Sequence, residues 1–172
     1  FLDSAENAQA ARDELFIVQY DEALALYREE EFYEAQLLFE EMEGYQDSDL
    51  YAEACQLWDD GGYTWSAARE QLPRLEELSL LIDVEPVLMS YDFFQIFIEG
   101  DWESSDGGGR FYFYQSAKEF GFPNFDVNDS YSMSGNELVP SSTGLPVSFA
   151  YVSFNELAIT LGDEGTFPYI RQ

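Results

Sequence analysis

Residues 23–55 read ALALYREEEFYEAQLLFEEMEGYQDSDLYAEAC, and this stretch decides the fold of the amino-terminal half. Small and bulky apolar residues recur in it at steps of three and four, which is the spacing of one face of an α-helix. Two segments, 29–31 and 44–48, interrupt the pattern and are predicted to be turns. The stretch therefore predicts helices that pack against one another as hairpins.

Helical periodicity continues on both sides of this stretch. The run that begins at Ser4 contains no Gly or Pro before the first turn, and it predicts one long helix or two abutting ones. Its buried apolar face is expected to include Leu15, Ala23 and Tyr27. Pro73 should bend or split the last helix of this half. The three helices predicted after the first cover residues 32–43, 47–58 (or 49–58) and 64–81.

The carboxyl-terminal half has a different residue pattern. From Gly100 onward, short segments in which apolar and polar residues alternate are separated by Gly, Pro, Asn and Ser. Residues 110–114 are the clearest predicted strand. Two hairpins are expected at residues 135–136 and 154–155, whose flanking residues match in type and position. Their strands are predicted over residues 131–134, 137–139, 146–152 and 156–161. The expected fold class is α+β, with antiparallel helix hairpins followed by a small antiparallel β meander or barrel.

The two halves are expected to form separate domains, residues 1–82 and 100–172. The intervening segment 83–99 is predicted to contain a linking helix over residues 87–98, because its apolar residues fall on one helical face. A strand is the competing interpretation for that segment, because its aromatic and β-branched residues also alternate.

The helical half resembles a known repeat family. The residues that carry the resemblance are Ala23-x-x-Leu26-Tyr27, Phe32-Tyr33-Glu34-Ala35-x-x-x-Phe39, Gly44-Tyr45-Gln46-Asp47-Ser48 and Ala52-x-x-Cys55. They are similar to the tetratricopeptide-type repeats of bacterial surface and membrane-associated proteins, over about residues 3–72. Glu30, where a Gly is usual, and Asp47, where Pro is common, depart from the pattern. The resemblance implies a protein-interaction scaffold, and the alternative is a packed helical spacer without a ligand.

The β half carries a second resemblance, in Gly100-Asp101-Trp102 and the closing Tyr169-x-Arg171. These residues resemble the opening Gly-x-Trp of lipocalins and related calycin β-barrels, over about residues 93–171. The resemblance implies that Arg171 packs over Trp102 in a structural cation–π contact. It also implies an apolar-ligand site if the barrel encloses a cavity. That cavity would be lined by Trp102, Phe111, Phe113, Phe149 and Tyr151. The alternative is that these aromatic residues are core residues.

Charge narrows the choice of partners. The 172 residues include 35 acidic and 7 basic ones, which gives a formal net charge of −28. Such a charge repels phosphate backbones and anionic lipid headgroups, which proteins bind through clustered Lys and Arg. We therefore expect no nucleic-acid partner, and we expect a protein or peptide partner to be basic.

The sequence offers few groups for catalysis or metal binding. It contains no histidine, which is the commonest general base and the most frequent metal ligand. The single cysteine, Cys55, is expected in the helical core and not as a reactive thiol. Segment 126–137 has oxygen-bearing side chains at alternate positions, but Tyr131 stands where a calcium-binding loop needs Gly. We expect no metal site and no cofactor.

From these observations we expect a non-catalytic interaction or scaffolding module, with a partner surface around Tyr20, Tyr27, Tyr33 and Tyr45. The first resemblance implies a bacterial protein outside the cytoplasm, whose membrane attachment would need an amino-terminal segment that this sequence does not contain. One alternative is the binding of an apolar small molecule by the β domain. Another is a carbohydrate-active enzyme that uses two carboxylates, a chemistry that needs no histidine.

Overall fold

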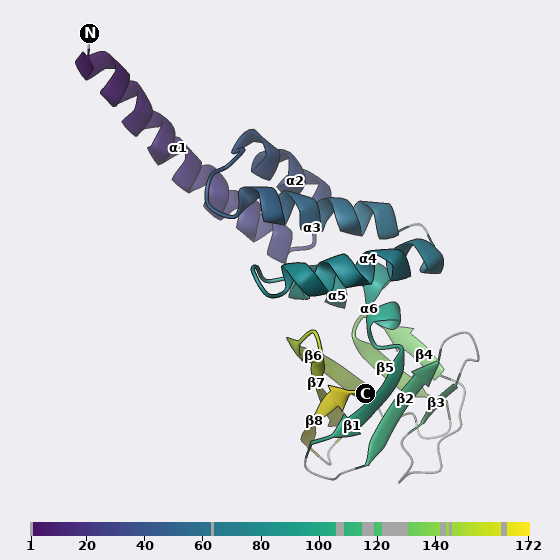
Figure 1. The fold of residues 1–172 in the computed structure, drawn as a ribbon. Helices are drawn as coiled ribbons and strands as arrows, with labels where there is room; N and C mark the ends of the chain where they lie inside the picture. The colour runs from purple at the N-terminus through teal and green to yellow at the C-terminus, as the bar shows by residue number, and fades with distance from the viewer. Residues whose placement is uncertain are drawn as a thin grey trace. The chain divides into compact units, whose positions relative to one another are not determined.

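The computed structural model describes residues 2–62, 64–105, 109–114, 119–121, 131–141, 144, 146–162 and 165–172. The chain divides into two compact units, Phe1–Val87 and Leu88–Gln172, here named the helical unit and the β unit. The first consists of helices and the second contains a curled antiparallel sheet (Figure 1). The fold class is therefore α+β, as predicted from the sequence.

Four helices build the helical unit: α1 (Leu2–Arg28), α2 (Phe32–Glu41), α3 (Ser48–Gly61) and α4 (Trp65–Leu78). Ring contacts show that α1, α2 and α3 run antiparallel in turn. The ion pair between Glu53, near the start of α3, and Arg74, near the end of α4, shows the same for the last pair. Between α1 and α2, Tyr27 meets Phe32 at 5.5 Å and Tyr20 meets Phe39 at 5.9 Å between ring centroids. Tyr51 on α3 stacks on Phe39 at 5.2 Å. The helices therefore form hairpins around a shared aromatic core.

The close approach of these helices depends on small residues. Ala23, Ala35 and Ala54 lie on α1, α2 and α3, and none of them has exposed surface. A side chain without atoms beyond Cβ lets a neighbouring backbone or ring come near, which is why the aromatic rings fit between the helices. This arrangement accounts for the alternation of small and bulky residues in the sequence.

The turn between α1 and α2 is a Schellman motif. The Glu31 N–H donates to the Leu26 carbonyl at 3.0 Å and the Glu30 N–H donates to the Tyr27 carbonyl at 3.3 Å. Glu30 occupies the left-handed position of this motif, with φ of 64°. Glycine usually fills that position, because a Cβ atom makes the left-handed conformation costly.

Two features of the helical unit differ from the sequence-based expectation. Leu15 is exposed and not part of the core, because it lies on a different face of α1 from Phe16 and Tyr20, whose rings pack against Tyr45. The second is α4, which continues through Pro73, so the split that was one of the two outcomes expected at this residue does not occur. Pro73 lies on an exposed part of α4, so its ring does not displace a packed neighbour.

Segment 83–99 holds two short helices, α5 (Glu85–Met89) and α6 (Tyr91–Phe97), where one helix was predicted. The competing interpretation of this segment as a strand is wrong. Ser90 separates the helices because its backbone is extended, with φ −62° and ψ 153°. The boundary between the two units falls inside α5.

The strands of the β unit form one antiparallel sheet in the order β3-β2-β1-β8-β7-β6-β5-β4. Strands that follow one another in the chain pair with each other, except β3 and β4, between which the described residues show no pairing. In addition, β1 pairs with β8. The sheet is thus an up-and-down half-barrel that is open at one place. The strands are β1 (Gly100–Ser104), β2 (Arg110–Tyr114), β3 (Glu119–Gly121), β4 (Tyr131–Ser134), β5 (Glu137–Pro140), β6 (Val147–Ser153), β7 (Glu156–Leu161) and β8 (Thr166–Arg171).

Large side chains fill the inner face of this sheet. Phe149 on β6 meets Phe111 on β2 at 5.4 Å, and it meets Phe94 of α6 at the same distance. Tyr131 on β4 contacts Phe120 on β3 at 5.7 Å, so rings bridge the two edge strands. The core of the β unit is therefore an aromatic cluster that includes α6.

Of the described helices, none is both long and apolar enough to cross a membrane.

Candidate functional site

The four tyrosines predicted as a partner surface are not brought together on one surface. Tyr20 and Tyr27 are buried in the helical core, and the Tyr27 hydroxyl donates to the Asp83 carbonyl at 3.1 Å. Tyr45 is half-buried, and Tyr33 alone of the four is exposed. The reason is the spacing of Tyr20, Ala23 and Tyr27, which puts all three on the face of α1 that packs against α2 and α3. The protein's own side chains cover that face.

The helical unit instead exposes large apolar side chains elsewhere on its first two helices. Leu15, Ile17 and Val18 of α1 are 54%, 52% and 63% exposed. On α2, Tyr33 and Leu37 are 65% and 47% exposed, and they lie one turn apart on the same outer face. These five residues are named here the exposed apolar surface of α1 and α2. Tyr33 is the only one of these five that was predicted to bind a partner, because α1 is apolar on two faces and periodicity does not say which face has a neighbour.

Carboxylates dominate the charge of the same unit. Residues 1–87 contain 23 of the chain's 35 acidic residues and 4 of its 7 basic ones. Arg12 stacks its guanidinium over the Phe16 ring at 5.0 Å, and Arg74 is held by Glu53 and Glu77. The exposed apolar surface is therefore set in a strongly negative field.

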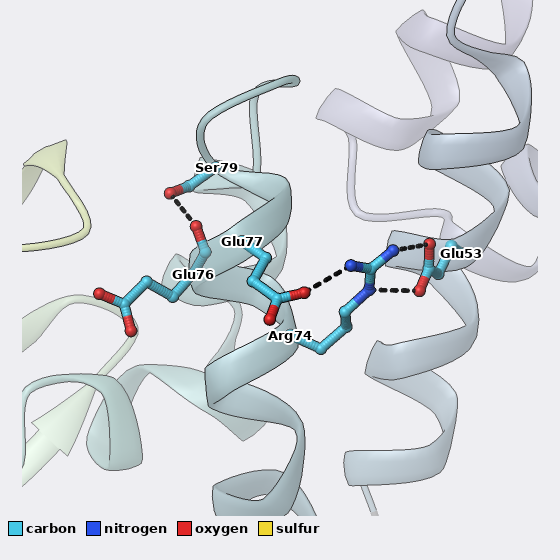
Figure 2. Close-up of polar contacts among 5 residues, drawn as sticks. All are labelled: Glu53, Arg74, Glu76, Glu77 and Ser79. Atoms are coloured by element: carbon cyan, nitrogen blue, oxygen red, sulfur yellow. Dashed lines mark hydrogen bonds and ion pairs between the residues drawn. The ribbon is translucent and has the colours of Figure 1, made fainter.

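Arg74 joins α3 to α4 (Figure 2). Its Nε and Nη2 atoms donate to the two carboxylate oxygens of Glu53 at 2.6 and 2.8 Å, and Nη1 donates to Glu77 Oε2 at 2.5 Å. The hydrogen bonds from Arg74 lower the pKa of the Glu53 carboxyl. Ser79 Oγ donates to the Glu76 carbonyl at 2.7 Å and ends α4. This network holds two helices together and has the geometry of a structural ion pair.

The five residues predicted to line a cavity in the β unit lie together on the inner face of the sheet. Trp102, Phe111, Phe113 and Phe149 are fully buried, and Tyr151 is half-buried. Their neighbours include α6. Phe97 of α6 meets Trp102 at 6.2 Å and Tyr151 at 6.0 Å. Side chains of α6 thus make the ring contacts that an apolar ligand would make in a hollow barrel.

Arg171 covers one end of this aromatic cluster. Its guanidinium carbon lies 4.5 Å from the Trp102 ring centre, 5.1 Å from that of Phe97 and 5.6 Å from that of Phe154. Its Nη2 donates to the Phe97 carbonyl, and Trp102 Nε1 donates to the Ile98 carbonyl at 2.9 Å. Trp102 and Arg171 are opposite one another in the register of β1 and β8, so their side chains share a face. This is the contact that the resemblance to lipocalins implied.

Among the described residues, Cys55 is not a reactive thiol and the acidic side chains form no metal site. Burial raises the pKa of the Cys55 thiol to about 12, so the thiol stays protonated at neutral pH. Within the part of the chain that the structure describes, no group of three or more Asp, Glu and Cys residues is placed to hold a metal ion. Residues 126–130 of the calcium-loop candidate lie outside the described residues, and residues 131–137 belong to β4, its turn and β5.

Glu85 is the described carboxyl that most resembles a general acid. Burial raises its pKa, and the nearby Asp83 carboxylate adds a smaller effect in the same direction. Asp83 Oδ1 also accepts the Glu85 N–H at 3.0 Å and so satisfies a free donor at the start of α5. The Asp83 carboxylate therefore has a structural role at the start of this short helix.

In comparisons with known proteins, no family model, no curated protein and no solved structure matches the chain. Its function therefore has to be argued from the geometry of its own residues.

Proposed function

We propose that the protein is a non-catalytic interaction module whose helical unit binds a basic protein or peptide. The observation that carries this proposal is the exposed apolar surface of α1 and α2 within a unit dominated by carboxylates. Neighbouring apolar side chains that remain in solvent mark candidate interaction surfaces. Tyr33 and Leu37 lie one turn apart on α2, and Leu15 and Val18 lie three residues apart on α1. Carboxylates around them steer basic partners to the surface and repel acidic ones.

We propose further that the helical unit is a divergent pair of tetratricopeptide-like hairpins and that the β unit is lipocalin-like. The antiparallel order of the helices supports the first assignment, as does the left-handed Glu30, where those repeats usually have Gly. The up-and-down strand order and the stacking of Arg171 on Trp102 support the second.

A location outside the cytoplasm of a bacterium rests on the first resemblance and is part of the proposal. Protease added to intact cells should degrade the protein. Degradation only after the cells are lysed would contradict this location.

Site-specific photo-crosslinking in the cell that makes the protein tests the interaction itself. A photoreactive phenylalanine analogue would replace Tyr33 or Leu37 on α2, and Val152 or Ile170 of the β unit in matched controls. All four positions are exposed, so the substitutions should leave the fold intact. We expect discrete adducts with a basic protein from the two α2 positions and not from the controls.

Two results would contradict the proposal. One is the absence of adducts from both α2 positions. The other is the same set of adducts from the α2 and β-unit positions, because that pattern reports random encounter and not a docking surface.

A further inference from the structure

Helix α1 is apolar on two different faces. One face packs into the helical core through Phe16, Tyr20, Ala23 and Tyr27. A second set of apolar residues recurs along the helix at steps of three, four and three, and all of its members are exposed: Ala8, Ala11, Leu15 and Val18. A run with this spacing forms a straight stripe along an α-helix.

The spacing of the stripe is that of a coiled-coil seam. With Leu15 in heptad position a, Ala8 is the preceding a residue, and Ala11 and Val18 are d residues. Such a seam normally packs into a second helix, but Leu15 and Val18 are 54% and 63% exposed here. The part of the chain that the structure describes thus leaves the seam open over about three turns, or roughly 15 Å.

Charged residues beside the seam define the chemistry of its occupant. Glu14 and Asp21 occupy position g on one flank of the seam, a position that pairs with charges on the partner helix. Arg12 occupies position e on the other flank, where its guanidinium stacks on the Phe16 ring at 5.0 Å. Glu22 takes the next a position and ends the apolar run. A partner helix would therefore bring an apolar seam of its own with Lys or Arg beside it.

A second copy of this chain fits the seam poorly. Each copy carries a formal net charge of −28, so two copies repel one another over the whole molecule as well as at Glu14 and Asp21. A basic helix gains from the same charges, because opposite signs meet at the flanks.

We infer that the open seam of α1, formed by Ala8, Ala11, Leu15 and Val18, is the docking surface for a basic amphipathic helix of another protein. The inference rests on the proposed interaction function and names the surface and the chemistry of the partner. The partner helix adds to the hairpins as a further helix packed on α1, on a face that does not enter the aromatic core.

The probe is a synthetic peptide of four heptads with Leu at positions a and d and Lys at positions e and g. A matched peptide carries Glu at e and g. Fluorescence anisotropy of each labelled peptide is measured against the full chain at low and at raised salt. The Lys peptide binds, and its affinity falls as salt rises, whereas the Glu peptide does not bind.

Matched double variants locate the binding site. L15D with V18D places two charges in the seam and weakens binding of the Lys peptide by about tenfold or more, because two apolar contacts are lost. L80D with L81D adds the same charge at another exposed apolar pair of the helical unit and leaves binding unchanged. Circular dichroism verifies that both variants keep the helical content of the parent protein.

Three outcomes would overturn the inference. Equal binding of the Lys peptide to the two double variants places the site outside the seam, and absence of binding at low salt removes the basic helix as occupant. In both cases adducts from Tyr33 and Leu37 in the crosslinking experiment would still support the proposed function. Sedimentation of the full chain as a dimer that L15D with V18D dissociates would make a second copy the occupant.

Discussion

The two units place their apolar side chains differently. In the β unit, the largest aromatic residues lie on the inner face of the sheet, where α6 and Arg171 cover them. The helical unit also has an aromatic core, but it leaves Leu15, Val18 and Tyr33 in solvent. Of the ten large apolar side chains exposed among the described residues, eight belong to the helical unit and two to the β unit. Among the described residues, the β unit thus buries its large apolar side chains more completely, whereas the helical unit leaves several of them in solvent, as the proposed interaction requires.

The largest expected effect tests whether the interior of the β unit is complete. Trp102→Ala removes a fully buried ring that contacts Phe97 and Arg171, and it should lower the free energy of unfolding by about 3–5 kcal/mol. Urea denaturation followed by circular dichroism measures the change.

Val152→Ala is the matched control on the same sheet, since Val152 is exposed and its loss should change stability by no more than about 0.5 kcal/mol. Equal effects of the two substitutions would mean that the inner face is not the core of the unit.

A smaller effect is expected at the cation that covers this interior. Arg171→Lys keeps the charge but removes the flat guanidinium that stacks on Trp102 and donates to the Phe97 carbonyl. We expect a loss of about 1–3 kcal/mol in the free energy of unfolding, from the stacking and the hydrogen bond together. Denaturation of the variant beside the parent protein provides the measurement. A Lys variant as stable as the parent would show that charge alone matters at this position.

Much of this architecture was predictable because local chemistry and the fold agree. The strands predicted at 110–114, 131–134 and 156–161 have those bounds in the structure, and each alternates clearly between turn residues. The helices of the first half were found for a similar reason, since small and bulky residues alternate with helical spacing. The contact between Arg171 and Trp102 came only from the family resemblance, since residues so far apart in sequence give no periodic signal.

β1, β3 and β8 were not predicted as strands, and the last two lack a local signal. β3 has three residues, and β8 contains Pro168, which argues against a strand between two neighbours. The register explains why this proline is tolerated. The Arg171 N–H donates to the Asn155 carbonyl, on the side of β8 that faces β7. Backbone groups of successive strand residues point to opposite sides, so the Pro168 nitrogen points toward β1. Pairing of β1 with β8 ends at Ser104 and Tyr169, just before Pro168 is reached. Because β1 ends at Ser104, the missing N–H of Pro168 costs this strand no hydrogen bond. The tolerance of Pro168 depends on this pairing between distant strands and has no signal in the local sequence.

The candidate site was less predictable for a physical reason. Tyr20, Tyr27, Leu15 and Val18 all follow helical spacing, and a sequence does not say which of the two faces of α1 meets a neighbour. The face with the aromatic residues was expected to be the partner surface, but it became core. The open seam is recognisable only when burial is known.

A stabilising change is expected in the turn of the helical unit. Glu30→Gly removes the Cβ atom that makes the left-handed conformation of this residue costly. Glycine also makes the unfolded chain more flexible, which offsets part of the gain. The net change should be a rise of about 0.5–1 kcal/mol in the free energy of unfolding. Glu29→Gly removes the same charge at a residue whose φ is not positive, so it should destabilise the protein or leave it unchanged. Thermal unfolding of the two variants compares them directly. Equal shifts would attribute the effect to charge and not to the backbone.

The smallest expected effect is the pH dependence of the ion pair between α3 and α4. Arg74 lowers the pKa of Glu53 in the folded protein, so the pair stabilises the fold at pH values above the pKa of Glu53 in the unfolded chain. This contribution disappears as pH falls through the lowered pKa, because the protonated carboxyl no longer pairs with Arg74. Glu53→Gln should therefore be less stable than the parent at about pH 7, and the difference should vanish in the acid range.

Glu77→Gln is the matched control. It removes the same charge but one hydrogen bond in place of two, so its loss of stability at neutral pH should be smaller. Both substitutions reduce the net negative charge equally, and the difference between their urea midpoints isolates the bidentate contact. The side chains of Glu53 and Arg74 are 37% and 44% exposed, so solvent and salt screen the pair and keep the effect small. A Glu53→Gln deficit that persists unchanged in acid would show that the side chain stabilises α3 by packing and not by its charge.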